Sequence, residues 1–116
     1  MKRGLLLNLK PILEKFLEKE MGADSALTLI NFSRKFSDFY TELENERIEL
    51  VKKYGEQRED GGYEVLDEEK KEKFAKAFNK ALSKEIDLEL LDVNDFKSLR
   101  ITPVEFSQFV HLFKRV

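Results

Sequence analysis

The chain has 116 residues, of which 41% are hydrophobic and 38% charged, and its formal net charge is −2. This length accommodates a single domain, residues 1–116, whose core can be stable without disulfides or metals. The slightly acidic balance argues against an obligate nucleic-acid-binding protein, because phosphate neutralisation normally needs a clear basic excess. With no cysteine, disulfides, thiolate nucleophiles and zinc–thiolate sites are excluded. We therefore expect a helical protein of one domain in a reducing compartment.

The first twenty residues predict a short strand followed by a helix. Residues 3–9 alternate leucines with smaller or polar neighbours, a strand pattern. Pro11 then favours the start of a helix that runs to about Glu20 and ends near Gly22 as a C-cap. Its apolar face consists of Ile12, Leu13, Phe16 and Leu17. The basic start followed by leucines resembles a signal peptide, but polar residues soon interrupt the apolar run. We therefore expect a cytoplasmic protein.

The run from Asp24 to Tyr54 predicts one amphipathic helix, capped by Asp24 or Ser25. Its apolar residues recur at spacings of three and four, which places them on one face. Such a helix would span roughly 45 Å, whereas a compact chain of this length has a radius of gyration of about 13 Å. Part of the stripe must then be covered by an elongated fold or by another chain. The predicted partner-binding residues are Leu43, Arg47, Leu50, Val51 and Tyr54 at its far end and Arg58 in the loop that follows.

The second half of the chain predicts a loop, two further helices and one or two strands. Residues 55–62 hold three of the five glycines and no apolar side chain, so we expect an exposed, mobile or hairpin-like loop. A short strand at 63–66 and a helix from Asp67 to about Ser83 follow. Residues 85–90 alternate strictly, as in a half-buried strand. Thr102, Pro103 and Glu105 then predict a helix start with an N-cap and a capping box.

These elements predict an α+β, mostly α fold, in which the long helix packs with three shorter helices and a small two- or three-stranded sheet. The ten phenylalanines are expected to form mainly core. In particular, the aromatic residues of the long helix are predicted to meet those of the two later helices. These residues are Phe32, Phe36 and Phe39 on one side, and Phe74, Phe78, Phe106 and Phe109 on the other.

No residue pattern predicts a catalytic, cofactor-binding or metal site. The acidic residues from Glu85 to Asp95 fail as an EF-hand loop, because Lys97 stands where glycine is required. On a strand these carboxylates would face water and discourage edge-to-edge aggregation. His111, the single histidine, lacks the context of a nucleophile. The glycines near Asp60 match no phosphate-binding motif.

The order of these features resembles a group of uncharacterised small proteins of tailed bacteriophages and prophages. The resemblance lies in a Leu-x-Leu segment before Pro11-Ile12-Leu13, a long helix beginning at Ser25, and several later phrases. These are Glu46-Arg47-Ile48-Glu49-Leu50-Val51-Lys52-Lys53-Tyr54-Gly55, Asp60-Gly61-Gly62-Tyr63, Phe78-Asn79-Lys80 and Glu85-Ile86-Asp87-Leu88. The loop at 55–62 is shorter than in many such relatives. The resemblance implies no activity, but it implies a role in virion assembly or host interaction, in the host cytoplasm.

Three functional interpretations follow. The leading one is a non-enzymatic, phage-type assembly or accessory protein that self-associates or binds another protein through the long helix and its loop. The second is an inhibitor whose acidic surface blocks a host defence or transcription machine, with a nucleotide sponge as a variant. In that variant Arg47, Lys52 and Arg58 would contact phosphates. The third is an enzyme, which no motif supports.

Overall fold

A computed structural model of the chain describes residues 1–115. Its helices and strands, in chain order, are α1 (Leu5–Phe16), α2 (Ala23–Tyr54), β1 (Glu56–Gln57), β2 (Tyr63–Glu64), α3 (Glu68–Leu82), the 3₁₀ helix η1 (Val93–Phe96), α4 (Pro103–Phe106) and the 3₁₀ helix η2 (Val110–Leu112). The strands pair antiparallel, with Glu56 opposite Glu64 and Gln57 opposite Tyr63. The predicted α+β, mostly α class is confirmed, and the sheet has two strands.

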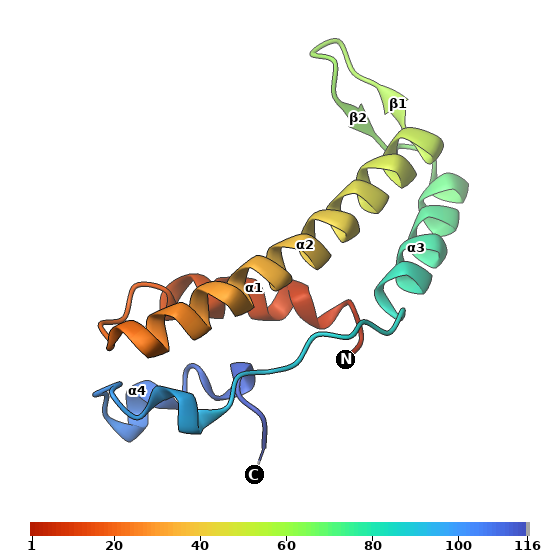
Figure 1. Cartoon of the computed structure of the whole chain (residues 1–116). Coiled ribbons are helices and arrows are strands. Elements are labelled where there is room, and N and C mark those ends of the chain that lie inside the picture. The colour runs from red at the N-terminus through yellow and green to blue at the C-terminus, as the bar shows by residue number, and fades with distance from the viewer. Residues whose placement is uncertain (116) are drawn as a thin grey trace.

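The molecule is elongated, and α2 runs through most of its length (Figure 1). Its principal extents are 52 × 30 × 25 Å and its radius of gyration is 17.8 Å, well above the roughly 13 Å of a compact chain of this size. We call residues 1–40 and 85–115 the head and residues 41–84 the arm. The predicted long helix is therefore confirmed, and an elongated fold accommodates it.

The head contains the hydrophobic core. The phenyl ring of Phe16, fully buried, lies 4.9 Å from the ring centre of Phe109, 5.5 Å from that of Phe96 and 5.6 Å from that of Phe113. Leucines and phenylalanines from α1, from the first half of α2 and from residues 85–115 complete this cluster: Leu6, Leu9, Leu13, Leu29, Phe32, Phe36, Leu88, Leu91 and Leu112. Three sequence segments that are distant along the chain therefore share one core.

The predicted N-terminal strand is wrong, because residues 5–16 form one helix. The leucines satisfy an alternating pattern and a helical pattern at once, and the helical one buries more of them. Leu6, Leu9, Leu13 and Phe16, spaced by three and four residues, are all buried, while Leu5 and Leu7 remain exposed. Pro11 lies inside α1 and does not start it.

The junction between α1 and α2 also differs from its prediction. α1 ends at Phe16, and Gly22 precedes α2 as its N-cap, with an extended backbone. Neither Asp24 nor Ser25 caps the helix. The buried hydroxyl of Ser25 instead donates a hydrogen bond to the carbonyl of Asp95 at 2.7 Å. Ser25 thus joins α2 to η1 within the head.

The arm is a helical pair with a hairpin at its tip. The second half of α2 packs against α3, and the hairpin of β1 and β2 connects them (Figure 1). The predicted cap at the start of α3 is confirmed, because the Asp67 side chain accepts a hydrogen bond from the Glu69 N–H. Within α3, residues 68–82, no side chain is buried. The apolar residues Phe74, Ala77, Phe78, Ala81 and Leu82 are only half-buried, since this helix packs against a single partner.

The segment after α3 is extended but is not the predicted strand. It runs back from the arm to the head (Figure 1), and the buried Leu88 lies between the exposed Asp87 and Glu89. Ladder-type pairing is confined to isolated bridges of Glu85 with Lys2 and of Leu91 with Phe113. The alternation of apolar and acidic residues therefore predicts correctly that one face of this segment is buried, although the segment is not part of a continuous sheet.

The predicted N-cap of the last α-helix is confirmed. Thr102 accepts a hydrogen bond from the Glu105 N–H at 3.1 Å, although α4 has only four residues.

The predicted contacts between aromatic residues of different helices are confirmed only in part. Phe32 and Phe36 belong to the same head core as Phe109. In the arm, by contrast, Phe74 and Phe78 stack on each other, with ring centres 5.8 Å apart. The aromatic residues thus form two separate groups.

Candidate functional site

The predicted partner-binding residues of the arm differ in their exposure. Leu43 is only 1% exposed, so its side chain lies inside the chain and offers no surface. Leu50, Val51 and Tyr54 are half-buried, and Leu50 lines a cleft between α2 and α3. The apolar residues at the end of α2 thus pack largely within the arm itself.

Two of the three basic residues considered as phosphate contacts have acidic neighbours. Arg47 forms an ion pair with Glu44 on the same helix at 3.0 Å. Arg58 lies 3.4 Å from Asp60 within the hairpin loop. The Lys52 ammonium lies 5.9 Å from the ring centre of Tyr63. Two of these three cations are therefore already engaged with carboxylates, and the third lies beside an aromatic ring.

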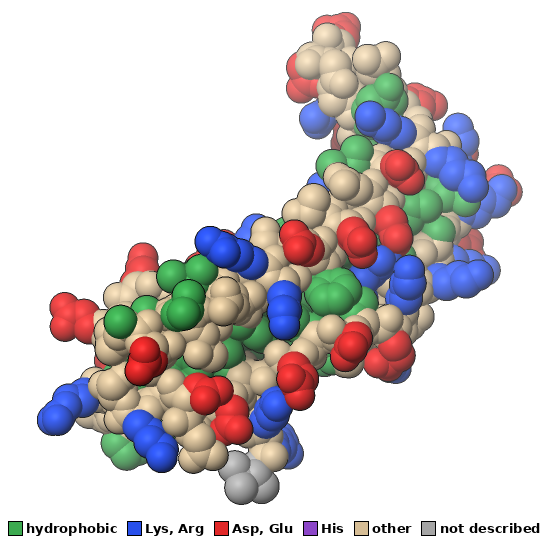
Figure 2. All heavy atoms as spheres, in the orientation of Figure 1, with side chains coloured by type: hydrophobic (Ala, Val, Ile, Leu, Met, Phe, Trp, Pro, Cys, Tyr) green, Lys and Arg blue, Asp and Glu red, His purple; other side chains and the backbone are tan. Residues whose placement is uncertain are grey.

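An exposed apolar surface lies near the tip of the arm, and Ile48 was not predicted as part of it. Ile48 is 40% exposed and Tyr63 is 36% exposed. Ile48 precedes Lys52 by one helical turn, and Lys52 contacts the Tyr63 ring. We call Ile48, Val51, Lys52 and Tyr63 the tip surface. Figure 2 shows basic and acidic side chains interspersed with apolar atoms over the arm.

Arg3 connects the head to the arm, a role that its sequence position did not indicate. Its guanidinium is 1% exposed and donates hydrogen bonds to both carboxylate oxygens of Glu46. Its Nε also donates to the Ala81 carbonyl at 3.2 Å. One buried cation therefore ties the N-terminus to α2 and to the end of α3. Buried arginines are found almost exclusively in such pairs.

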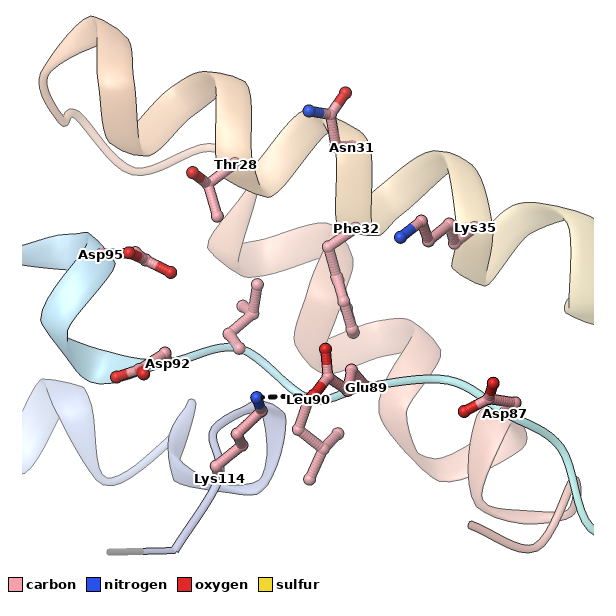
Figure 3. A pocket seen from close by; sticks show the side chains of 11 residues that line it. Thr28, Asn31, Phe32, Lys35, Asp87, Glu89, Leu90, Asp92, Asp95 and Lys114 are labelled. Atoms are coloured by element: carbon pink, nitrogen blue, oxygen red, sulfur yellow. Dashed lines mark hydrogen bonds and ion pairs between the residues drawn. The ribbon is translucent and has the colours of Figure 1, made fainter.

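A cleft of about 500 Å³ separates the first half of α2 from the extended segment in the head (Figure 3). Polar side chains of α2, including Thr28, Asn31 and Lys35, form one wall. The other wall carries Asp87, Glu89, Asp92, Asp95 and Lys114. The buried side chains of Phe32 and Leu91 add an apolar part to the lining. The acidic residues from 85 to 95 thus meet a second element that the sequence did not place beside them.

Glu89 and Lys114 interact directly within this cleft, with Nζ donating to Oε1 at 3.0 Å (Figure 3). This hydrogen bond, together with the charge of Lys114, lowers the pKa of Glu89, and the nearby Lys35 contributes in the same direction. The hydrogen bond to Glu89 likewise raises the pKa of Lys114, and Asp92 and Asp95 add to this effect. Both groups remain charged at neutral pH, so the pair is an ion pair and not a proton-transfer couple.

The described chain contains no arrangement typical of a metal centre or a nucleophile. Across residues 1–115, no three histidine or carboxylate side chains are grouped closely enough to hold a metal ion. His111 is exposed on η2. The Ser107 hydroxyl donates to the Val104 carbonyl at 2.6 Å, so this hydroxyl is engaged with the backbone.

Comparison with known proteins gives no relative: no family model matches the sequence, and no curated protein or solved structure is significantly similar to it. The resemblance to small phage proteins therefore stays a prediction. Among residues 1–115, no helix combines the length and apolar character needed to cross a membrane.

Proposed function

We propose that this protein acts through protein–protein contacts and self-associates through its arm. The observation that carries the proposal is the incomplete packing of α3. α3 packs against α2, but none of its apolar residues, including Phe74 and Phe78, is fully buried. A helix usually buries an apolar face against a core, and in the arm only one other helix is available. A second copy of the chain would supply the missing layer.

The surface of the arm is compatible with such pairing. The three glutamates of α3 each pair with a lysine of the same helix, so most of the charge on α3 is balanced within the helix and would oppose a second arm little. The tip surface adds exposed apolar atoms at Ile48 and Tyr63. Together with the resemblance to small phage proteins, these features support an assembly or accessory role.

The competing interpretation as a nucleotide sponge has weaker support. It requires Arg47, Lys52 and Arg58 to contact phosphates, but Arg47 and Arg58 already pair with Glu44 and Asp60. A phosphate would first have to displace these carboxylates. The proposal of an enzyme has no support from the arrangement of side chains.

The test is the mass of the protein in solution, measured by light scattering on a size-exclusion column over a range of concentrations. We expect the wild-type chain to form a discrete oligomer, and the double variant Ile48→Lys/Tyr63→Lys to shift towards the monomer. Two buried ammonium groups at an apolar contact would weaken association at least about tenfold. Both positions are exposed in the single chain, so the fold should be retained.

A matched control places the same charges on the head. Leu27 and Val104 are 60% and 77% exposed, and the Leu27→Lys/Val104→Lys variant should associate like wild type. A wild-type monomer at all concentrations would overturn the proposal. So would equal weakening by both variants, since the arm would then have no special part in association.

A further inference from the structure

The extended segment that forms one wall of the cleft has free edges. Ile86 is fully paired with the N-terminus: its N–H donates to the Met1 carbonyl at 2.9 Å, and its carbonyl accepts from the Met1 amine at 3.1 Å. Leu91 is fully paired with the C-terminal segment, through Leu112 at 2.8 Å and Lys114 at 2.7 Å. Within residues 1–115, the backbone groups of residues 87–90 have no protein hydrogen-bond partner.

These unpaired groups have a definite arrangement. Successive residues of an extended chain direct their N–H and C=O groups to opposite edges. Asp87 and Glu89 therefore share the edge on which Leu91 pairs with the C-terminal segment. In this parallel pairing, the residues just before Phe113 would have to lie opposite Glu89. These residues form the 3₁₀ helix η2 (Val110–Leu112), so the C-terminal segment does not run alongside Glu89 and Asp87. Both of these residues are exposed, which leaves this edge open to an incoming strand.

The charges of the cleft select the kind of strand that can bind. Four carboxylates and two lysines line it, and the pair of Glu89 with Lys114 neutralises one of each. Of the remaining charges in the lining, Asp87, Asp92 and Asp95 outnumber Lys35, so the cleft keeps a net negative charge. A second copy of this segment would bring its own carboxylates against these, and like charges on paired strands repel. A strand with basic side chains would complement them.

We propose that the cleft between α2 and residues 87–92 binds an extended, lysine- or arginine-containing segment of another protein by strand addition. The backbone of the bound segment pairs with Asp87 and Glu89, which supplies affinity independent of sequence. Its basic side chains meet Asp87, Asp92 and Asp95, and its apolar atoms contact Phe32 and Leu91. This site is separate from the arm and does not depend on self-association.

The probe is a fluorescent ten-residue peptide in which lysine alternates with threonine, titrated with the full-length protein and followed by anisotropy. We expect saturable binding that weakens between about 0.05 and about 1 M salt, because exposed charges are screened. A second peptide is N-methylated at every residue, so that neither of its edges can donate backbone hydrogen bonds. It keeps every charge and should bind about tenfold more weakly.

The variant Asp87→Asn/Asp95→Asn tests the protein side. Neither carboxylate forms an ion pair within residues 1–115, so this variant should unfold like wild type while binding the peptide at least about fivefold more weakly. The matched control Glu56→Gln/Glu59→Gln removes two exposed charges from the hairpin and should leave affinity within about twofold.

Several results would overturn the proposal. Absence of saturable binding at low salt would remove it altogether. Equal affinity for the methylated peptide would exclude strand addition, and equal weakening by both double variants would exclude the cleft as the site. A change of solution mass in Asp87→Asn/Asp95→Asn, without a change of peptide affinity, would assign the cleft to a second copy of the chain.

Discussion

The head and the arm share one helix but differ in how they are stabilised. Of the buried hydrophobic side chains within residues 1–115, Leu43 is the only one that lies in the arm. The head buries aromatic and leucine side chains from three segments, whereas the arm depends on half-buried contacts and on the buried Arg3. Burial of apolar surface is the main favourable term in folding. The arm is therefore the part of the chain with most to gain from a partner.

The largest expected effect comes from the head core. Phe16→Ala removes a fully buried ring that contacts three others, and it should lower the free energy of unfolding by about 4 kcal/mol. The matched change in the arm, Phe78→Ala, should cost only about 1–2 kcal/mol, because that ring is half-buried. Urea unfolding followed by far-UV circular dichroism, at a concentration where the chain is monomeric, measures both. Equal costs would remove the distinction between the two regions.

The next largest expected effect concerns the ion pair of Arg3 and Glu46, which connects the head to the arm. Glu46→Gln leaves the buried Arg3 guanidinium without a counter-charge, and because the Glu46 side chain is 42% exposed, the change should cost about 2 kcal/mol. Glu44→Gln is the matched control, since its partner Arg47 is 41% exposed and the loss should stay under about 1 kcal/mol.

Amide hydrogen exchange then shows where the Glu46→Gln effect falls. In this variant we expect α3 to lose protection before the head core does, because Arg3 also binds the Ala81 carbonyl near the end of α3. Simultaneous loss of protection throughout the chain would show that arm and head unfold as one unit.

The smallest effect involves the exposed pair in the cleft. Lys114 lowers the pKa of Glu89, so the pair is intact at neutral pH and is lost as the pH falls through that lowered pKa. Lys114→Met should therefore raise the pKa of Glu89 towards its ordinary value, as measured by NMR titration of its carboxyl carbon. Lys35→Met should raise it less, because Lys35 makes the smaller contribution. A larger shift from Lys35→Met would mean that Glu89 faces α2 in solution.

Helices are predicted best from the sequence where the apolar residues fit a helical spacing and no strand alternation. In α2 and α3 the apolar residues recur only at helical spacings, and local caps such as Asp67 and Thr102 are independent of the rest of the fold. The leucines of residues 3–9 satisfy two periodicities, and tertiary burial of Leu6 and Leu9 decides between them.

The candidate sites were less predictable, because each depends on residues from distant segments. The cleft joins α2 to the segment of Asp87 and to Lys114, and no local spacing reports that proximity. Likewise, the predicted surface residue Leu43 is covered within the chain, while Ile48, five residues further along α2, is exposed. A helical stripe tells which side chains share a face, but not which neighbour covers that face.

The unbroken course of α2 sets the spacing of the two proposed contacts. This helix contains neither glycine nor proline, the usual causes of kinks, and Asn31 in the cleft is separated from Ile48 at the tip by 17 residues. At 1.5 Å per residue these positions lie about 25 Å apart along the axis. Partners bound at both proposed contacts would therefore be held at a fixed separation, which a single inserted helical turn would lengthen by about 5 Å.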